Sequence, residues 1–362
     1  MSLNYIGSKK SLIDFINIPI SAILTKTKKP LTILDGFAGT GIIGMHFQTK
    51  YKNLNVFAND LEYYSFIINF AQLCVPYSEK LENIIIEINN SLKDTKSKEN
   101  YNLIADNYSL KGEAQRMFWT EENAVRADYI KYLLDSFLKK GKIDDNEYKF
   151  LNASLLTSID KVANTASVYG AFLKKFKTSA KHKLELKAIH IQETLNNNKV
   201  FNEDINSEVI LEQKYDIVYL DPPYNQRQYS SNYHPLNYIA KYDKTIEVYG
   251  KTGLLKDSNK SKYCQKKEAF EMLSHLVNNL KTRHILLSYN NEGIMDFEKI
   301  KELLTGLGKV ILYQKAYKKF KSNIVIDDEN ADADVDADKN VYEYLFHLDK
   351  LEKKEFIIQK ID

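Results

Sequence analysis

The stretch Asp216-Ile-Val-Tyr-Leu-Asp221-Pro222-Pro223-Tyr224 is the part of the sequence that most constrains the fold. Its first part is a short β-branched and aromatic run, which predicts a buried strand. Two consecutive prolines end that strand, because neither can donate to a sheet ladder and both fix φ. We therefore expect a carboxylate, the Asp221 and Pro222 carbonyls and an aromatic ring at the C-terminal edge of a sheet, where open α/β sheets bind their ligands. The same residues would also occur in a rigid turn whose role is only to end a strand, with no function in binding or catalysis.

A strand, a glycine-rich turn and a helix follow one another near the N-terminus. Leu31 to Asp35 is an apolar strand that runs into Gly36-Phe37-Ala38-Gly39-Thr40-Gly41, and a helix is predicted from Ile42 to Gln48. Such a turn lets the backbone approach a ligand without interference from Cβ atoms. The spacing is not Gly-x-Gly-x-x-Gly, which disfavours a nicotinamide or flavin cofactor.

A second predicted strand, Asn55 to Asn59, ends at Asp60. This acid lies 25 positions after Asp35, about where such folds place the carboxylate that holds ribose hydroxyls. The glycine turn and the acid, in this order, predict an adenosine-containing cofactor.

With the Asp-Pro-Pro-Tyr tetrad downstream, the sequence resembles the Dam-like amino methyltransferases, group alpha, of bacterial restriction-modification systems. Phe37-Ala-Gly39-Thr-Gly41 matches their Phe-x-Gly-x-Gly cofactor motif, and Tyr5-Ile-Gly7-Ser-Lys9 resembles their N-terminal segment, which closes over the methionine end of the cofactor. The resemblance covers roughly residues 1–75 and 198–349. It implies S-adenosylmethionine as cofactor and an α/β, Rossmann-like sheet with a C-terminal antiparallel hairpin.

The resemblance also implies roles for single residues. Asp221, Pro222, Pro223 and Tyr224 would be catalytic, acting on the N6 amino group of an adenine flipped out of duplex DNA. The resemblance further places Asp204, in a motif like the family's third, near the cofactor adenine. The cofactor-binding set is Tyr5, Lys9, Asp35, Phe37, Gly39, Gly41, Asp60 and Asp204. Lys9 is a candidate partner either for the cofactor carboxylate or for Asp221. The chemistry requires neither a metal nor a covalent enzyme intermediate.

The sequence divides into a cofactor-binding half (1–76), a mainly helical insert (77–199) and a catalytic half (200–362). The insert occupies the interval where better-known Dam-type enzymes carry target recognition, so we expect it to form part of the DNA-reading surface. One stretch of the insert holds seven lysines and a single acid: Lys161, Lys174, Lys175, Lys177, Lys181, Lys183, Lys187 and Glu185. This pattern fits a phosphate-contact surface or a solvated helix face. Ser154 to Ala171 resembles a stretch of type IIS-like adenine methylases, from which no mechanism follows.

Several later segments are also candidates. Asn225 to Tyr233 is too polar for a core and is predicted to cover the target base, and Tyr249 to Tyr263 is predicted to be a mobile basic loop and a second DNA contact. His284 to Gly293 is predicted to be a strand, and the resemblance implies that its polar end lies near the base pocket. Lys318 to Asn323 resembles a loop beside the active site, and the acidic stretch Asp327 to Asp338 is predicted to be a disordered hairpin tip.

Composition excludes some classes of protein. The chain has 362 residues, of which 44% are hydrophobic and 27% charged, as in ordinary soluble domains. No apolar run approaches the ~20 residues of a membrane span and no signal-peptide pattern is present, so a cytoplasmic bacterial protein is predicted. Cys74 and Cys264 lack metal-ligand spacing and are expected to be free thiols.

The predicted partner is double-stranded DNA, with a cognate restriction endonuclease acting as a separate protein. Three alternatives remain open at this point. A cytosine-N4 methyltransferase uses the same chemistry, although its tetrad usually begins with Ser. An RNA methyltransferase shares the fold. A catalytically inactive DNA-binding module is the non-enzyme alternative, and the intact glycine loop argues against it.

Overall fold

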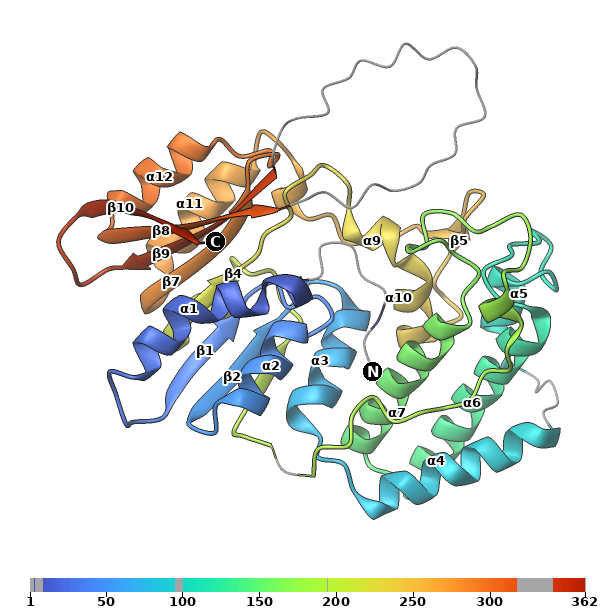
Figure 1. Ribbon diagram of the computed structural model, residues 1–362. Helices are drawn as coiled ribbons and strands as arrows, with labels where there is room; N and C mark the ends of the chain where they lie inside the picture. Colours follow the sequence, from blue (N-terminus) through green and yellow to red (C-terminus); the bar gives the residue numbers. More distant parts are fainter. Residues whose placement is uncertain (1–2, 4–8, 95–99, 194, 318–340, 362) are drawn as a thin grey trace, which may run out of the picture.

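The computed structural model describes residues 3, 9–94, 100–193, 195–317 and 341–361 (Figure 1). Its centre is an eight-stranded sheet in the order β10-β8-β9-β7-β4-β1-β2-β3. The strands are β1 (Leu31–Asp35), β2 (Leu54–Asn59), β3 (Lys199–Phe201), β4 (Lys214–Leu220), β7 (Lys281–Asn290), β8 (Lys309–Tyr317), β9 (Val341–Asp349) and β10 (Glu355–Ile361). Within this described sheet β9 alone runs antiparallel, between β7 and β8. The predicted Rossmann-like sheet with a C-terminal antiparallel pair is confirmed.

The central strands are buried on both faces, as their apolar sequences require. Ile33 and Ile217 point to the face covered by α1 and α2, whereas Leu34 and Val218 point to the face covered by α11 and α12. The bounds of these helices are α1 (Ile13–Leu24), α2 (Ile42–Lys50), α11 (Ala269–Asn279) and α12 (Phe297–Thr305). Successive residues of a strand thus anchor opposite layers, which fixes the register of the sheet.

The insert forms a helical layer beside the sheet, as Figure 1 shows. Its helices are α4 (Glu79–Ser91), α5 (Leu103–Tyr108), α6 (Glu121–Lys139) and α7 (Asp145–Lys161). They share one apolar core with α3 (Tyr63–Cys74) and α10 (His234–Lys241), in which Tyr64, Phe150 and Tyr233 are buried. The layer is therefore packed directly against a helix of the cofactor-binding half.

The insert is helical only as far as Lys161. Among the described residues of 162–198 the regular structure before β3 is a short 3-10 turn, η3 (Thr178–Lys181). The Asn164 side chain donates to the Met117 and Leu173 carbonyls, both at 3.0 Å, and accepts from the Lys177 amide. These bonds hold an irregular path, so most of the lysine-rich stretch is loop and not the face of a helix.

A second basic segment also differs from its prediction. Tyr249 to Tyr263 was expected to be a mobile loop, but it contains the hairpin β5 (Val248–Tyr249) and β6 (Leu254–Leu255) and the turn η4 (Lys262–Cys264). The Arg116 guanidinium donates to the Gly250 carbonyl at 2.9 Å, and the Tyr108 hydroxyl donates to the Gly253 carbonyl at 2.8 Å. Buried side chains of the insert thus anchor the hairpin.

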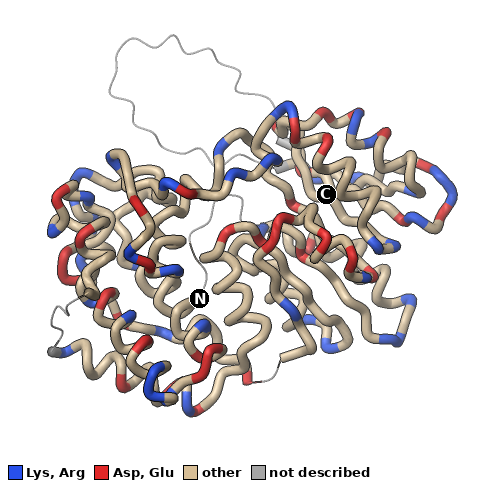
Figure 2. Tube along the Cα trace, turned by 180° about the vertical axis from the view of Figure 1, so that it is seen from behind, with Lys and Arg blue, Asp and Glu red and all other residues tan. Residues whose placement is uncertain are grey.

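The remaining short elements are η1 (Lys9–Leu12), η2 (Leu92–Asp94), α8 (Glu208–Leu211) and α9 (Tyr229–Asn232). The segments Lys318 to Asn323 and Asp327 to Asp338 lie outside the described residues. In the described ranges, no helix combines the length and apolar character that crossing a bilayer requires. Lysines and arginines are spread over both the sheet and the insert and are interspersed with acids (Figure 2).

The buried Arg126 is expected to stabilise the insert strongly. Its guanidinium donates to the Leu184 carbonyl at 2.9 and 2.8 Å and to the Leu92 carbonyl at 2.8 Å, which joins α6 to η2 and to the loop around Leu184. Replacing Arg126 with methionine should lower the free energy of unfolding by about 2–4 kcal/mol, because these carbonyls lose a charged donor. Urea denaturation measures the change. Lys139→Met, at an exposed position of the same helix, should change stability little; an equal loss in both variants would contradict this role.

Candidate active site

The carboxyl ends of three parallel strands bring the predicted site residues to one edge of the sheet. β1 ends at Asp35, which pairs in register with Tyr219 of β4, and the tetrad starting at Asp221 follows β4 directly. β2 ends one residue before Asp60. Parallel strands place these ends side by side, so motifs far apart in the sequence meet as the sequence predicts.

The glycine loop is held in place from two sides. Asp60 accepts from the Gly39 amide at 2.8 Å, and Ser65 and Asn69 of α3 donate to the Gly39 carbonyl. Gly41 has φ +75°, and a Cβ added there would contact Asn69 Oδ1 at 2.6 Å. Only glycine fits this position without strain or collision. The result is a backbone turn that approaches the adjoining cavity closely.

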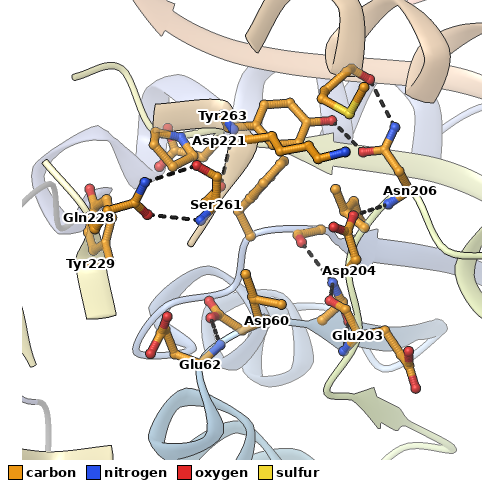
Figure 3. Close-up of a pocket in the computed structure, with 18 residues that line it drawn as sticks. Asp60, Glu62, Glu203, Asp204, Asn206, Asp221, Gln228, Tyr229, Ser261 and Tyr263 are labelled. Atoms are coloured by element: carbon orange, nitrogen blue, oxygen red, sulfur yellow. Dashed lines mark hydrogen bonds between the residues drawn. The ribbon is translucent and has the colours of Figure 1, made fainter. Parts of the chain in front are cut away.

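The larger cavity at this edge, which we call the main cavity, lies between the glycine loop and the segments that follow β3 and β4 (Figure 3). Phe37 and Tyr263 meet edge to face with ring centroids 5.0 Å apart. Gln228 donates to the Ser261 carbonyl at 3.1 Å and accepts from the Ser261 amide at 2.8 Å, which closes one side. The acids that line the cavity are Asp60, Glu62, Glu203, Asp204 and Asp221.

A smaller cavity, the inner cavity, lies next to the main one. It is lined by Lys9, Asp35, Phe37, Thr40, Tyr219 and Asp221, together with the backbone of the glycine loop. Asp221 and Phe37 line both cavities. The Asp221 carboxylate therefore lies where the two spaces adjoin, and Asp35 contributes an oxygen, Oδ2, that has no hydrogen-bond partner among the described residues.

Lys9 is paired with two carboxylates. Its Nζ lies 3.2 Å from Asp221 Oδ1 and 3.6 Å from Glu343 Oε2, and the three side chains are 7%, 19% and 10% exposed. The same ammonium lies 5.8 Å from the centroid of the Tyr224 ring. Of the two partners that the sequence left open for Lys9, the structure thus brings it to Asp221.

Burial shapes the charges of the site. Burial raises the pKa of Asp221 to about 6, with Lys9 lowering it and Glu343 raising it. Burial, together with the neighbouring Asp221 and Asp60 carboxylates, raises the pKa of Asp35 to about 8. Burial alone would lower the pKa of Lys9, but attraction to Asp221 and Glu343 raises it. The site holds more acids than cations, an environment that favours a positively charged ligand.

The pH dependence of activity should reveal the Lys9–Asp221 pair. The ionised Asp221 is the form that accepts hydrogen bonds, so the rate of the methylation that the resemblance implies should fall as the pH drops through about 6. In Lys9→Met the acidic limb of the plot of rate against pH should move to higher pH, because the Asp221 carboxylate loses the cation that lowers its pKa. Methylation rates from pH 5 to 9 measure the limb. Lys10→Met, at the exposed neighbouring position, should leave it in place; an unmoved limb in Lys9→Met would contradict the pairing.

Sequence reasoning missed some residues of this edge. Glu343 of β9 reaches Lys9 because β9 runs antiparallel and begins at the edge where the parallel strands end. Its only signal is an acid within an aromatic and apolar strand. Gln228 and Ser261 lie in two segments for which the sequence predicts contacts to the target base and to DNA, but their bonds to each other beside the main cavity were not predicted. Tyr5 lies outside the described residues, so its predicted role is untested.

A model of the family described as D12 class N6 adenine-specific DNA methyltransferase matches residues 5–303. The chain belongs to this family. This D12 methyltransferase is 37% identical over 350 residues to the Type II methyltransferase M.NlaIII of Neisseria lactamica. The aligned region covers 96% of this chain and 99% of that protein. These matches confirm the predicted family resemblance and support the main prediction, an N6-adenine DNA methyltransferase.

Two further relatives match over most of this D12 methyltransferase. M.CviAII of Paramecium bursaria Chlorella virus 1 is 38% identical over 322 residues, 89% of this chain and 94% of that protein. M.FokI of Planomicrobium okeanokoites is 36% identical over 358 residues, 96% of this chain. The chain spans 53% of the length of M.FokI.

Proposed function

We propose that the chain transfers a methyl group from S-adenosylmethionine to the N6 amino group of an adenine flipped out of duplex DNA. The observation that carries this proposal is the position of Asp221, which lines both cavities and is paired with Lys9. One carboxylate can thus face a cofactor on one side and a target base on the other.

The residues at this edge fit S-adenosylmethionine. The cofactor carries a positive sulfonium and a positive ammonium, and the acid-rich site with the unpartnered Asp35 oxygen suits such charges. Gly39 and Gly41 would let the backbone approach it, Asp60 would accept from ribose hydroxyls, and Phe37 and Asp204 would contact its adenine. When bound, the cofactor supplies a methyl group activated for displacement by the positive sulfur.

The tetrad would activate the target nitrogen. The adenine amino group is a poor nucleophile, because its lone pair is delocalised into the ring. Asp221 and the Pro222 carbonyl would accept hydrogen bonds from its two N–H groups, which localises the lone pair, and the carboxylate would stabilise positive charge that develops on nitrogen. Tyr224 would stack on the flipped base, an interaction worth roughly 1–3 kcal/mol. Lys9 would keep Asp221 ionised at neutral pH.

The biological setting is proposed from the relatives. M.NlaIII and M.FokI are named as type II methyltransferases, and another relative as a modification methylase. We infer that this chain protects DNA in a restriction-modification system, with the endonuclease as a separate protein. The division at residues 76 and 199, with the insert forming part of the DNA surface, is part of the same proposal. It is supported by the packing of the insert against α3 and α10.

Product identification tests the proposal. The protein is incubated with methyl-labelled S-adenosylmethionine and unmethylated duplex DNA, single-stranded DNA or total RNA, and the products are digested to nucleosides for mass spectrometry. Labelled N6-methyldeoxyadenosine from duplex DNA is the expected result. Label in cytosine or in RNA would overturn the proposed substrate, and no label in any nucleic acid would overturn the proposed reaction.

A further inference from the structure

A second hollow lies beside the active site, on the side of the helical insert. It holds about 510 Å³ and has three walls: residues 166–173 of the insert, residues 227–232 after the tetrad, and the β5–β6 hairpin. We call it the recognition hollow. Arg227, in its wall, follows Tyr224 by three residues. A duplex whose adenine stacked on Tyr224 would therefore present its neighbouring base pairs to this hollow.

The recognition hollow contains polar side chains that have no hydrogen-bond partner among the described residues. Asn232 is only 6% exposed, yet none of the residues that the structure describes hydrogen-bonds its side-chain amide. Its Oδ1 lies 3.8 Å from the place that a Cβ of Gly170 would occupy, so the amide faces the insert wall of the hollow. The amide atoms are not among the fully buried side-chain atoms that lack a partner, so they are accessible from the hollow. A ligand in the hollow can therefore hydrogen-bond this amide.

The other polar side chains of the hollow are also available. Within the described ranges, no residue pairs with the exposed guanidinium of Arg227, and none hydrogen-bonds the hydroxyls of Ser231 and Thr252. The Thr252 and Ser231 carbonyls lie 2.8 and 2.9 Å from the two ring nitrogens of the buried His234. The His234 ring thus contacts both backbone segments that carry these groups, one at Ser231 and one at Thr252, and fixes them relative to each other.

The insert wall is equally well fixed. The Tyr169 amide donates to the Asn232 carbonyl at 2.9 Å, and the Tyr169 hydroxyl donates to Asp160 at 2.9 Å. Tyr169 is fully buried and packs against Trp119, whose indole N–H donates to the Ile159 carbonyl. The stretch Ser154 to Ala171, for which the sequence offered no mechanism, therefore builds a rigid wall and joins it to α9.

These side chains match the chemistry of base recognition. An arginine fork pairs with guanine O6 and N7, an asparagine amide pairs with adenine N6 and N7, and hydroxyls serve either base. A phosphate site would concentrate cations, but Arg227 is the one cation in the lining. Lys174 and Lys175 are exposed at the end of the insert wall, where they can meet the DNA backbone.

We infer that the recognition hollow reads one base pair of the recognition sequence next to the target adenine, through Arg227 and Asn232. This inference rests on the proposed function, because it takes duplex DNA as the ligand. Specificity in this protein then comes from the junction between the insert and the loop after the tetrad, and the insert alone would not provide it.

Selection from a random duplex library tests the inference. The full chain is bound to the library with and without S-adenosylhomocysteine, and the bound DNA is sequenced. In Arg227→Ala, preference at one base pair should fall by roughly 5- to 150-fold, the discrimination of a single bidentate pair, while the other preferred positions persist. Asn232→Ala should act at the same base pair or its neighbour.

The matched control is Lys174→Ala, which should weaken binding to all duplexes alike and reduce its dependence on salt. The inference is overturned if Arg227→Ala leaves every position unchanged or weakens all duplexes by one factor. Arg227 is exposed and its side chain holds no other element, so loss of folding does not explain a change. Methylation by the unaltered protein, measured in parallel, tests the proposed function separately.

Discussion

Replacing Asp221 with alanine should lower the single-turnover rate of adenine methylation by at least about a hundredfold. The variant loses the acceptor for an amino proton and the charge that stabilises the developing cation, and the loss of one such preorganised group typically costs 10²–10³ in rate. The rate is measured with labelled S-adenosylmethionine and saturating duplex DNA. Asp221→Asn, which keeps the size and one acceptor oxygen, should retain more activity than the alanine variant.

The control for Asp221 lies on the same strand. Asp216, at the opposite end of β4, accepts from the Thr32 amide at 2.7 Å and is exposed. Asp216→Asn should therefore leave the methylation rate near that of the unaltered protein. If Asp221→Ala retained a near-normal rate while folded, Asp221 would not be the catalytic carboxylate.

Replacing Gly41 with alanine should abolish measurable binding of S-adenosylmethionine, or weaken it by more than about tenfold. A left-handed φ costs an L-residue roughly 1–2 kcal/mol. At Gly41 the new methyl group would also contact the buried side chains of Gln72 and of Asn69, which donates to the Gly39 carbonyl. The turn must then shift away from the position at which its backbone reaches the ligand. Equilibrium dialysis measures the affinity, and circular dichroism checks the fold.

Gly141 provides a control matched in backbone geometry. It has φ +66°, but nothing lies within 4 Å of an added Cβ, and it lines neither the main nor the inner cavity. Gly141→Ala should lose some stability and keep full cofactor affinity. Equal losses of affinity in the two variants would mean that strain, and not the shape of the loop, explains the effect.

Local signals predicted much of the fold. The apolar run 31–35 became β1 with those bounds, and the predicted strand 55–59 became β2 with one more residue at its start, because a short buried strand flanked by turns has few alternative structures. The tetrad lies at the edge that its prolines require. Asp35, Asp60 and Asp221 converge because parallel strands align their ends, a rule that needs no knowledge of side chains.

Long-range contacts could not be predicted in the same way. Glu343 approaches Lys9 through the register of β9, which pairing between distant segments decides. The irregular path after Lys161 is held in part by the side chain of Asn164, whose three partners lie up to 47 residues away. The strand β10, with a largely exposed sequence, carries no clear alternation of buried and exposed residues.

Helix α3 contacts the glycine loop with one face and the insert with the other. Ser65 and Asn69 hold the glycine loop, whereas Ile67, Ile68 and Ala71 lie in the apolar core shared with the insert. An engineer who exchanged the insert for that of a relative, in order to change the sequence that is methylated, would repack the second face. The first face would then move with it, so such a chimera would change its affinity for cofactor along with its target. Exchanging α3 and α10 together with the insert would keep the interface intact.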